Sequence, residues 1–297
     1  MEIFEPVNLL VQTKPVGSLG NVLLGIGAYL GKSFMIYQAM KETTTNFAQF
    51  GIWGTTLTAK TSDGISLSGY LFGPPEEEGR NKLPCVIFFH ENAGTVGQRF
   101  SYFAEYVTRC RVNLVVFGYR GYSKSPGHPS MGGLQKDGDA ILEKVFKDLG
   151  AQVNLEKVII HGKSLGGGVG SHAVSQDKWN GKVQGVILDT CFNSMSKLVT
   201  HTVPALGSVA DEIFANEMWD VVEAAQKFNK NVPVLVIGAV NDEICPYEHS
   251  VNLYNAMINQ GRKTHFETFD EGGHNDFTII NGQKYFNTIK TFIDSLQ

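Results

Sequence analysis

Short apolar runs alternate with stretches of helical length along most of this chain, and no other feature limits the fold as strongly. Each run is apolar throughout rather than at every second residue, which is typical of a strand that is buried on both faces of a sheet. The runs are CVIFFH (85–90), NLVVFGY (113–119), KVIIHG (157–162), VQGVILD (183–189) and VPVLVIGAV (232–240). Strands that alternate with helices indicate βαβ units and a mostly parallel sheet.

The remaining patterns complete one α/β domain over residues 51–297. Residues 55–73 alternate around Asp63-Gly64, which predicts a β-hairpin, and KTHFETFD (263–270) predicts a last strand. Apolar residues at helical spacing predict helices over 130–149, 247–260 and 283–296. The interval 191–231 is longer than a plain crossover helix, so we expect a small helical insertion of two or three helices that caps part of the site.

Residues 1–50 form a separate N-terminal segment. Between Lys14 and Lys32 the chain carries no charge, and a further apolar patch extends to Met40. A membrane helix needs about 20 mostly apolar residues, so residues 16–40 predict either membrane contact or an apolar helix packed on the domain. No signal-peptide cleavage site follows.

Charge and cysteine content limit which binding partners and which cellular compartment we expect. The formal net charge is −4, and no basic field is available for nucleic acid, so we expect no nucleic-acid partner. The four cysteines, Cys85, Cys110, Cys191 and Cys245, are far apart and show neither a CxxC pair nor zinc-ligand spacing. Together with the apolar N-terminus, this favours a membrane-associated protein facing the cytosol, with a cytoplasmic protein as the alternative.

Ser164 is the candidate nucleophile. It lies in Gly162-Lys163-Ser164-Leu165-Gly166, between the run KVIIHG and a stretch of small residues. A Gly-x-Ser-x-Gly sequence between a strand and a helix predicts a nucleophile elbow, in which small neighbours let the strand and the helix approach each other. The first helical N–H, that of Leu165, is then a candidate oxyanion donor.

A serine hydroxyl needs a base, and the base needs an acid to orient it. In chain order an elbow serine is followed by the acid and then by the histidine. Asp242 follows the run 232–240, and His274 follows the strand 263–270, so both are expected at carboxyl ends of strands. Glu243 and Asp189 remain alternative acids.

The second oxyanion donor is expected in the loop after CVIFFH. This loop begins His90-Glu91-Asn92, and we assign the donor to the backbone N–H of Asn92. The carboxylate of Glu91 would oppose an oxyanion unless it turns away. No step of such a reaction needs a metal or an organic cofactor.

These motifs, in this order, resemble those of the bud-emergence-type α/β hydrolases from Thr55 to the C-terminus. The residues that carry the resemblance are His90-Glu91-Asn92-Ala93-Gly94, Tyr119-Arg120-Gly121-Tyr122, Pro129-Ser130 with Gly133-Leu134, Gly162–Gly167, Asp242-Glu243 with Pro246, and His274-Asn275-Asp276. The resemblance implies an α/β-hydrolase fold, a hydrolase activity and, in many members, an N-terminal membrane anchor. Glu91 and Ser123 stand where the family more often has glycine.

The leading hypothesis is a serine hydrolase that cleaves ester or thioester bonds of acyl or lipidic substrates through an acyl-serine intermediate. A lipidated protein is one such substrate, which would make the reaction protein depalmitoylation. One alternative is a serine peptidase of the prolyl-oligopeptidase type, against which we count the absence of a large N-terminal propeller. The other is a membrane-tethered scaffold without catalysis.

Overall fold

The computed structural model describes residues 36–42, 46–75, 78–202 and 217–296. The chain divides into two compact units, Met1–Ile36 and Tyr37–Gln297. Residues 37–50 therefore belong to the larger unit, whereas the sequence groups them with the N-terminal segment. Most of the apolar stretch 16–40 lies outside the described residues, and its membrane contact stays a prediction. No helix in the described part of the chain has both the length and the hydropathy to cross a membrane.

The larger unit is built on one mostly parallel sheet of eight strands, as the alternating runs predict. The strands lie in the order β1-β2-β4-β3-β5-β6-β7-β8. They are β1 (Trp53–Lys60), β2 (Ser66–Gly73), β3 (Pro84–Phe89), β4 (Asn113–Phe117), β5 (Asn154–Lys163), β6 (Gly185–Asp189), β7 (Val234–Ala239) and β8 (Thr264–Phe269). The hairpin β1–β2 and the pair β2–β4 are antiparallel, and all pairs from β4 to β8 are parallel. The carboxyl ends of the parallel strands therefore meet at one edge, where α/β sheets place their sites.

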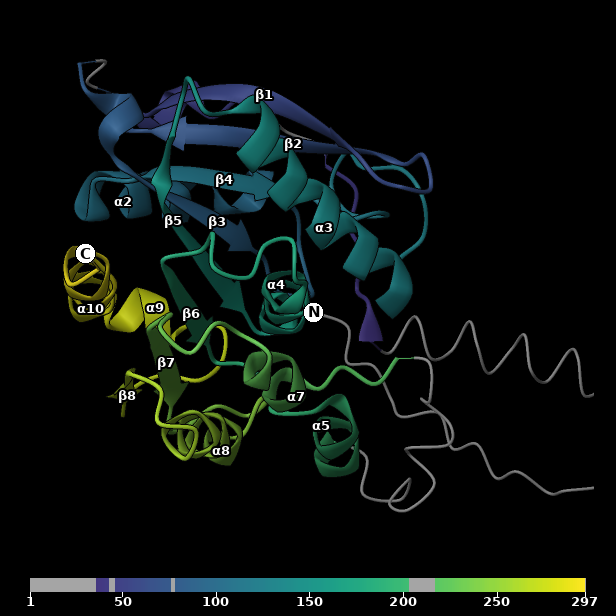
Figure 1. Cartoon of the computed structure of the whole chain (residues 1–297), viewed down its shortest axis with the longest axis vertical. Helices are drawn as coiled ribbons and strands as arrows, with labels where there is room; N and C mark the ends of the chain where they lie inside the picture. Colours follow the sequence, from purple (N-terminus) through teal and green to yellow (C-terminus); the bar gives the residue numbers. More distant parts are fainter. Residues whose placement is uncertain (1–35, 43–45, 76–77, 203–216, 297) are drawn as a thin grey trace, which may run out of the picture. The chain divides into compact units, whose positions relative to one another are not determined.

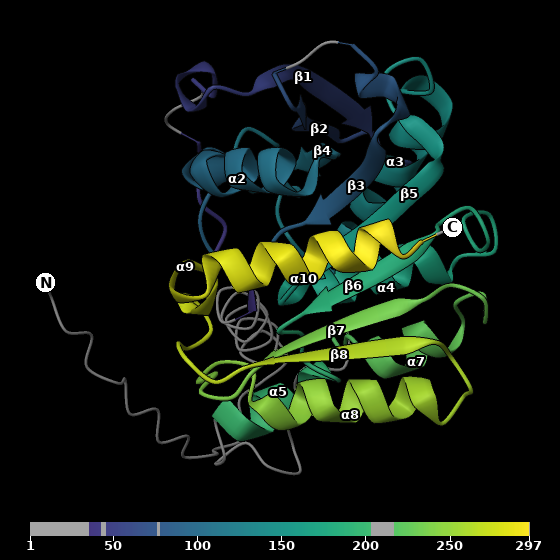
Figure 2. The same ribbon diagram turned by 90° about the vertical axis from the view of Figure 1, so that its left-hand side faces the viewer.

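Helices cover both faces of this sheet (Figures 1 and 2). One face carries α2 (Phe100–Cys110) and α10 (Gly282–Asp294), which lie in front of the strands in Figure 2. The other face carries α3 (Met131–Asp148), α4 (Leu165–Ser175), α7 (Val221–Gln226) and α8 (Tyr247–Ile258). The shorter elements are α5 (Met195–Thr202), α9 (Phe277–Ile280), η1 (Ala48–Phe50), η2 (Arg80–Lys82) and η3 (Gly97–Arg99).

The predicted helices are confirmed to within a few residues as α3, α8 and α10. Helix α3 begins after Ser130, whose hydroxyl accepts a hydrogen bond from the Gly133 N–H, as expected of an N-cap. Of the expected insertion 191–231, the structure describes α5 and α7, and residues 203–216 lie outside the described part. The role of this insertion as a cap stays a prediction.

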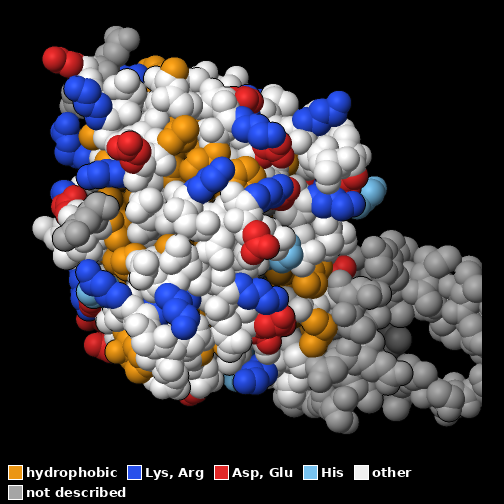
Figure 3. Space-filling model, in the orientation of Figure 1, with side chains coloured by type: hydrophobic (Ala, Val, Ile, Leu, Met, Phe, Trp, Pro, Cys, Tyr) orange, Lys and Arg blue, Asp and Glu red, His pale blue; other side chains and the backbone are white. Residues whose placement is uncertain are grey.

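The core explains why the central strands are apolar without alternation. Side chains of β3 and β4 are buried whichever face they point to, because helices cover both faces. Under α2 and α10 the core is aromatic, with the rings of Phe103 and Tyr106 each packed edge to face against Phe88. On the face shown in Figure 3, acidic and basic side chains are interspersed, and neither sign forms a continuous field there.

Candidate active site

The turn between β5 and α4 holds Ser164 in a strained backbone conformation, with φ 51° and ψ −118°. The residues two positions before and after it have to be glycine, because a Cβ on Gly162 of β5 would lie 2.5 Å from the Gly166 carbonyl oxygen in α4, and a Cβ on Gly166 would lie 1.9 Å from the Phe89 carbonyl oxygen. A Cβ on Gly167 would lie 2.1 Å from Cys191 Sγ. The close approach of strand and helix predicted for a nucleophile elbow is therefore present.

The structure brings together the three residues that the chain order selects. His274 Nε2 lies 3.1 Å from Ser164 Oγ, and His274 Nδ1 lies 2.7 Å from Asp242 Oδ2. All three residues are buried, with at most 7% of each exposed. They come from the loops after β5, β7 and β8, at the carboxyl edge of the sheet.

Hydrogen bonds to Asp242 fix its carboxylate and so define the histidine tautomer. Oδ1 accepts from the backbone N–H groups of Ile244 (2.9 Å) and Cys245 (2.7 Å), which leaves Oδ2 for the imidazole. Because an ionised carboxylate can only accept, Nδ1 of His274 carries the hydrogen, and the Nε2 lone pair faces the serine hydroxyl. Such an arrangement can remove the serine proton.

Neither alternative acid contacts the imidazole of His274. Asp189 is buried beneath the elbow, where Oδ2 accepts from Tyr285 Oη at 2.6 Å. Glu243 contacts the same loop but accepts from the backbone N–H of His274, at 3.0 Å. Glu243 therefore orients the histidine loop rather than the ring.

The loop after β3 borders the nucleophile, because Gly166 packs directly against the carbonyl groups of Phe89 and His90. Within this loop the side chain of Asn92 is fixed, since its Oδ1 accepts from Tyr122 Oη (2.7 Å) and from the backbone N–H of Gln38 (2.8 Å). Leu165 is the first residue of α4, and its N–H has no acceptor within the helix. The roles of the Asn92 and Leu165 backbone N–H groups as oxyanion donors stay predictions.

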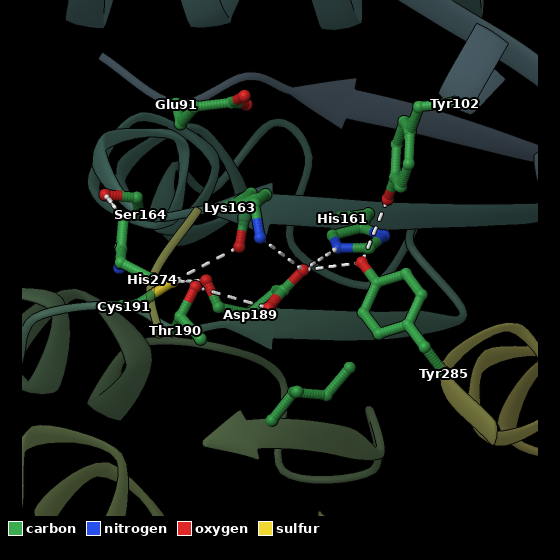
Figure 4. A network of polar contacts seen from close by, with 12 residues as sticks. Glu91, Tyr102, His161, Lys163, Ser164, Asp189, Thr190, Cys191, His274 and Tyr285 are labelled. Atoms are coloured by element: carbon green, nitrogen blue, oxygen red, sulfur yellow. Dashed lines mark hydrogen bonds and ion pairs between the residues drawn. The ribbon is translucent and has the colours of Figure 1, made fainter. Parts of the chain in front are cut away.

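Glu91 turns away from the serine (Figure 4) and pairs with Arg99, whose Nε lies 2.7 Å from Oε1. Burial alone would raise the pKa of Glu91, but the positive charges of Arg99 and Lys163 outweigh it, and the pKa is lowered. The carboxylate is therefore ionised, yet its charge is balanced by Arg99 and directed away from Ser164. This orientation is the one that an oxyanion site beside Glu91 requires.

Comparison with known proteins places the chain in a family. The sequence profile of the prolyl oligopeptidase family matches residues 138–296, which is more than half of the chain and includes Ser164, Asp242 and His274. The chain belongs to the prolyl oligopeptidase family. It is therefore a hydrolase of the serine hydrolase superfamily.

Relatives and solved structures agree with this placement. The protein bem46 of Schizosaccharomyces pombe is 27% identical over 284 residues, covering 94% of this chain and 91% of that protein. A Saccharomyces cerevisiae protein described as an uncharacterized membrane protein, YNL320W, is 28% identical over 82% of this chain and 80% of its own length. The resemblance to bud-emergence-type hydrolases is thus confirmed. The Pyrococcus furiosus esterase Pf2001 superimposes with a TM-score of 0.69 at 13% identity, covering 88% of this chain and 98% of that one, which confirms the α/β-hydrolase fold.

In this member of the prolyl oligopeptidase family, a buried polar network lies beneath the elbow (Figure 4). Its centre is Asp189, which accepts from Tyr285 and contacts His161 Nε2 at 3.3 Å and Lys163 Nζ at 3.6 Å. Burial alone would raise the pKa of Asp189, but Lys163 and His161 outweigh it and lower the pKa. Tyr102 extends the network through a 2.9 Å contact between its hydroxyl and that of Tyr285.

A cavity of about 600 Å³ lies behind the catalytic loops, on the face of α2 and α10. Glu91, Lys163 and Asn275 line it, and each is the sequence neighbour of a predicted site residue. Lys163 Nζ also lies 4.6 Å from the centre of the Phe277 ring. The described residues contain no group of three or more His, Cys, Asp or Glu side chains that could hold a metal ion.

Proposed function

We propose that the protein cleaves ester or thioester bonds of acyl or lipidic substrates, with Ser164 as nucleophile, His274 as general base and Asp242 as the orienting acid. The observation that carries this proposal is the unbroken series of contacts from Asp242 Oδ2 to His274 and from His274 Nε2 to Ser164 Oγ. Members of such a series act as one catalytic unit.

The reaction follows from this geometry in two half-reactions. Ser164 Oγ attacks the acyl carbonyl carbon while His274 Nε2 takes the hydroxyl proton, and the Asp242 carboxylate stabilises the imidazolium. The backbone N–H groups of Leu165 and Asn92 donate to the oxyanion. The leaving alkoxide or thiolate takes the proton from His274, and a water molecule activated by the same histidine then hydrolyses the acyl-serine.

A lipidic substrate is favoured by the mostly apolar stretch 16–40 of the sequence, which would bring the enzyme to a membrane surface facing the cytosol. A relative described as a membrane protein agrees with this placement. The natural substrate in this proposal is an acyl ester or a fatty-acyl thioester, including that of a lipidated protein.

Peptide hydrolysis is the second candidate, and the family profile is the observation that favours it. The two activities share the nucleophile and the base, so they differ in the leaving group, an amine in place of an alcohol or a thiol. Cleavage of blocked prolyl peptide amides without turnover of acyl esters and thioesters would select the peptidase.

The test is covalent labelling by a fluorophosphonate probe, which needs an activated serine. We expect the wild type to be labelled and Ser164→Ala to take no label, because the probe would bond to Ser164 Oγ. Ser171→Ala removes another buried serine, on α4, and should label like the wild type. A folded wild type without label would refute the proposed reaction and leave the non-catalytic scaffold. Panels of acyl esters, acyl thioesters and peptide amides would then identify the leaving group.

A further inference from the structure

Residues Tyr37–Glu42, here called the N-terminal strap, run alongside the loop that carries the predicted oxyanion donor. Ala39 forms a parallel β-bridge with Gly94, and the Gln38 N–H donates to Asn92 Oδ1 at 2.8 Å. Lys41 forms a second parallel bridge, with Ser123. The strap therefore adds a short extended segment to the outer side of the site.

We propose that the strap is a positioning element for the oxyanion loop, and that the Gln38 N–H is its main contact. This inference rests on the proposed function, because it assigns a role to the strap within that reaction. Asn92 joins the strap to the site. Its side chain accepts a hydrogen bond from Gln38, and its backbone N–H is the assigned oxyanion donor. An oxyanion donor acts only when it is already oriented, so a residue that fixes Asn92 contributes to the rate without touching substrate.

The far end of the strap holds the other end of the same loop. Glu42 Oε2 accepts from the Gly97 N–H at 2.7 Å, and Oε1 accepts from Thr95 Oγ1 at 3.2 Å. Ser123, which is bridged to the strap, also accepts from the Val96 N–H at 2.8 Å through its hydroxyl. The segment from Asn92 to Gly97 is thus hydrogen-bonded at both ends. Its first residue binds Gln38 of the strap, and its last two bind Ser123 and Glu42.

The strap is in turn anchored by a buried hydrogen-bonded group. Tyr37 Oη donates to Glu217 Oε2 at 2.5 Å and accepts from Trp219 Nε1 at 3.2 Å. The same Glu217 oxygen accepts from the Met131 N–H at the start of α3, at 2.7 Å. Tyr37, Glu217 and Trp219 are each at most 4% exposed. The start of the strap is therefore tied to the C-terminal part of the predicted insertion 191–231, as well as to the start of α3.

Loss of a whole oxyanion donor lowers kcat by about 10²–10³-fold in serine hydrolases. Release of Asn92 from the strap leaves the donor present but less well oriented, so we expect a smaller loss, about tenfold in kcat. KM should change little, because the strap acts on the transition state rather than on substrate binding.

The test compares Gln38→Pro with Gln38→Ala in the full chain. Proline removes the N–H that donates to Asn92, whereas alanine keeps it and removes only the side chain. We expect Gln38→Pro to slow fluorophosphonate labelling and lower kcat on an acyl ester about tenfold at nearly constant KM. Hydrogen exchange in the peptide covering residues 90–99 should accelerate at the same time. Gln38→Ala should behave as the wild type in all three measurements.

Equal labelling rates and equal exchange in Gln38→Pro and the wild type would overturn the inference. If the proline variant does not fold, Asn92→Ala, which removes both side-chain hydrogen bonds and keeps the backbone N–H, replaces it with the same expected results. A wild type that takes no label refutes the proposed function, and the exchange measurement then decides on the strap alone. Unchanged hydrogen exchange at residues 90–99 in the Gln38→Pro variant would then refute the positioning role of the strap as well.

Discussion

Among the residues that the structure describes, two serines have a positive φ, a conformation that favours glycine, and in each case the hydroxyl explains why serine is present. Ser164 has φ 51° and places its Oγ against His274; Ser123 also has φ 51° and accepts from the Val96 N–H. Residues with a Cβ in such conformations carry strain of about 1–3 kcal/mol. At Ser123 the resemblance to the bud-emergence-type hydrolases leads us to expect glycine, so the serine here combines a strained backbone with a hydrogen bond next to the strap.

The strain at Ser164 predicts that activity and stability oppose each other there. Ser164→Ala and Ser164→Gly both remove the nucleophile, but only glycine relieves the backbone strain. Allowing for the greater entropy of glycine in the unfolded chain, we expect Ser164→Gly to be about 1 kcal/mol more stable than Ser164→Ala. Urea unfolding of the two inactive variants measures this difference. An alanine variant more stable than the glycine variant by about 0.4–1 kcal/mol, the difference that the entropy of glycine alone predicts, would show that the turn is not strained.

At the scale of elements, the buried network connects β5, β6 and α10. Lys163 ends β5, Asp189 ends β6, and Tyr285 comes from α10. The three side chains meet on the face of the sheet below the elbow. A buried ion pair contributes little net stability by itself, but removal of one partner leaves an uncompensated charge.

We therefore expect Asp189→Asn to lower the free energy of unfolding by about 3 kcal/mol, because Lys163 stays buried without its counter-charge. Lys163→Met should cost less, since Asp189 keeps its contacts with Tyr285 and His161. In a double-mutant cycle the loss in the double variant should be smaller than the sum of the two single losses. Lys144→Met, which breaks an i,i+4 pair with Asp148, should change stability by about 0.5 kcal/mol or less. Additive losses would mean that Lys163 and Asp189 do not interact.

At the scale of the whole molecule, buried histidines make stability depend on pH. Burial lowers the pKa of His161 and His249, and it lowers the pKa of His90 from 6.5 to about 3. The folded protein therefore holds these rings neutral, whereas the unfolded chain protonates them below about pH 6.5. The contribution of these neutral histidines to the free energy of unfolding is complete above about pH 6.5 and is lost as the pH falls towards their folded-state pKa values.

We expect the free energy of unfolding to fall steadily between pH 6.5 and pH 4. The variant His90→Phe keeps an aromatic ring against Tyr119 and removes one titrating group. Its slope in this range should be shallower by up to about 1.4 kcal/mol per pH unit, the value for one proton. Urea unfolding at several pH values gives both slopes. Parallel curves for the two proteins would contradict the lowered pKa of His90.

The strands along the chain, and the three residues at the ends of three of them, could be predicted from the sequence because both depend on local patterns, whereas the order of the strands in the sheet was not predicted. Continuous apolar runs identify parallel strands, and the order Ser164, Asp242, His274 follows from the chain direction in this fold. Helix α2 has a comparable signal, apolar residues at Phe100, Phe103 and Val107, that would have identified it.

The network and the strap could not be predicted, because they join residues far apart in the chain. Asp189 ends a strand, as the acid of a triad does, and only the structure shows that it contacts Lys163 and His161 instead of His274. In the same way, nothing local to Gln38 indicates that its N–H meets Asn92. Such contacts depend on how distant elements pack, which residue patterns do not record.

The position of Tyr285, well after Ser164 in the chain, has a consequence for biosynthesis. A ribosome delivers α10 after every strand of the sheet, so the elbow strand β5 and its neighbour β6 are synthesised before the hydroxyl that completes the contacts of Asp189. N-terminal parts of a chain begin to fold while synthesis continues. An elbow that forms in the nascent chain before α10 is made therefore holds the carboxylate of Asp189 short of one hydrogen-bond partner, and the arrival of α10 completes the support beneath the nucleophile.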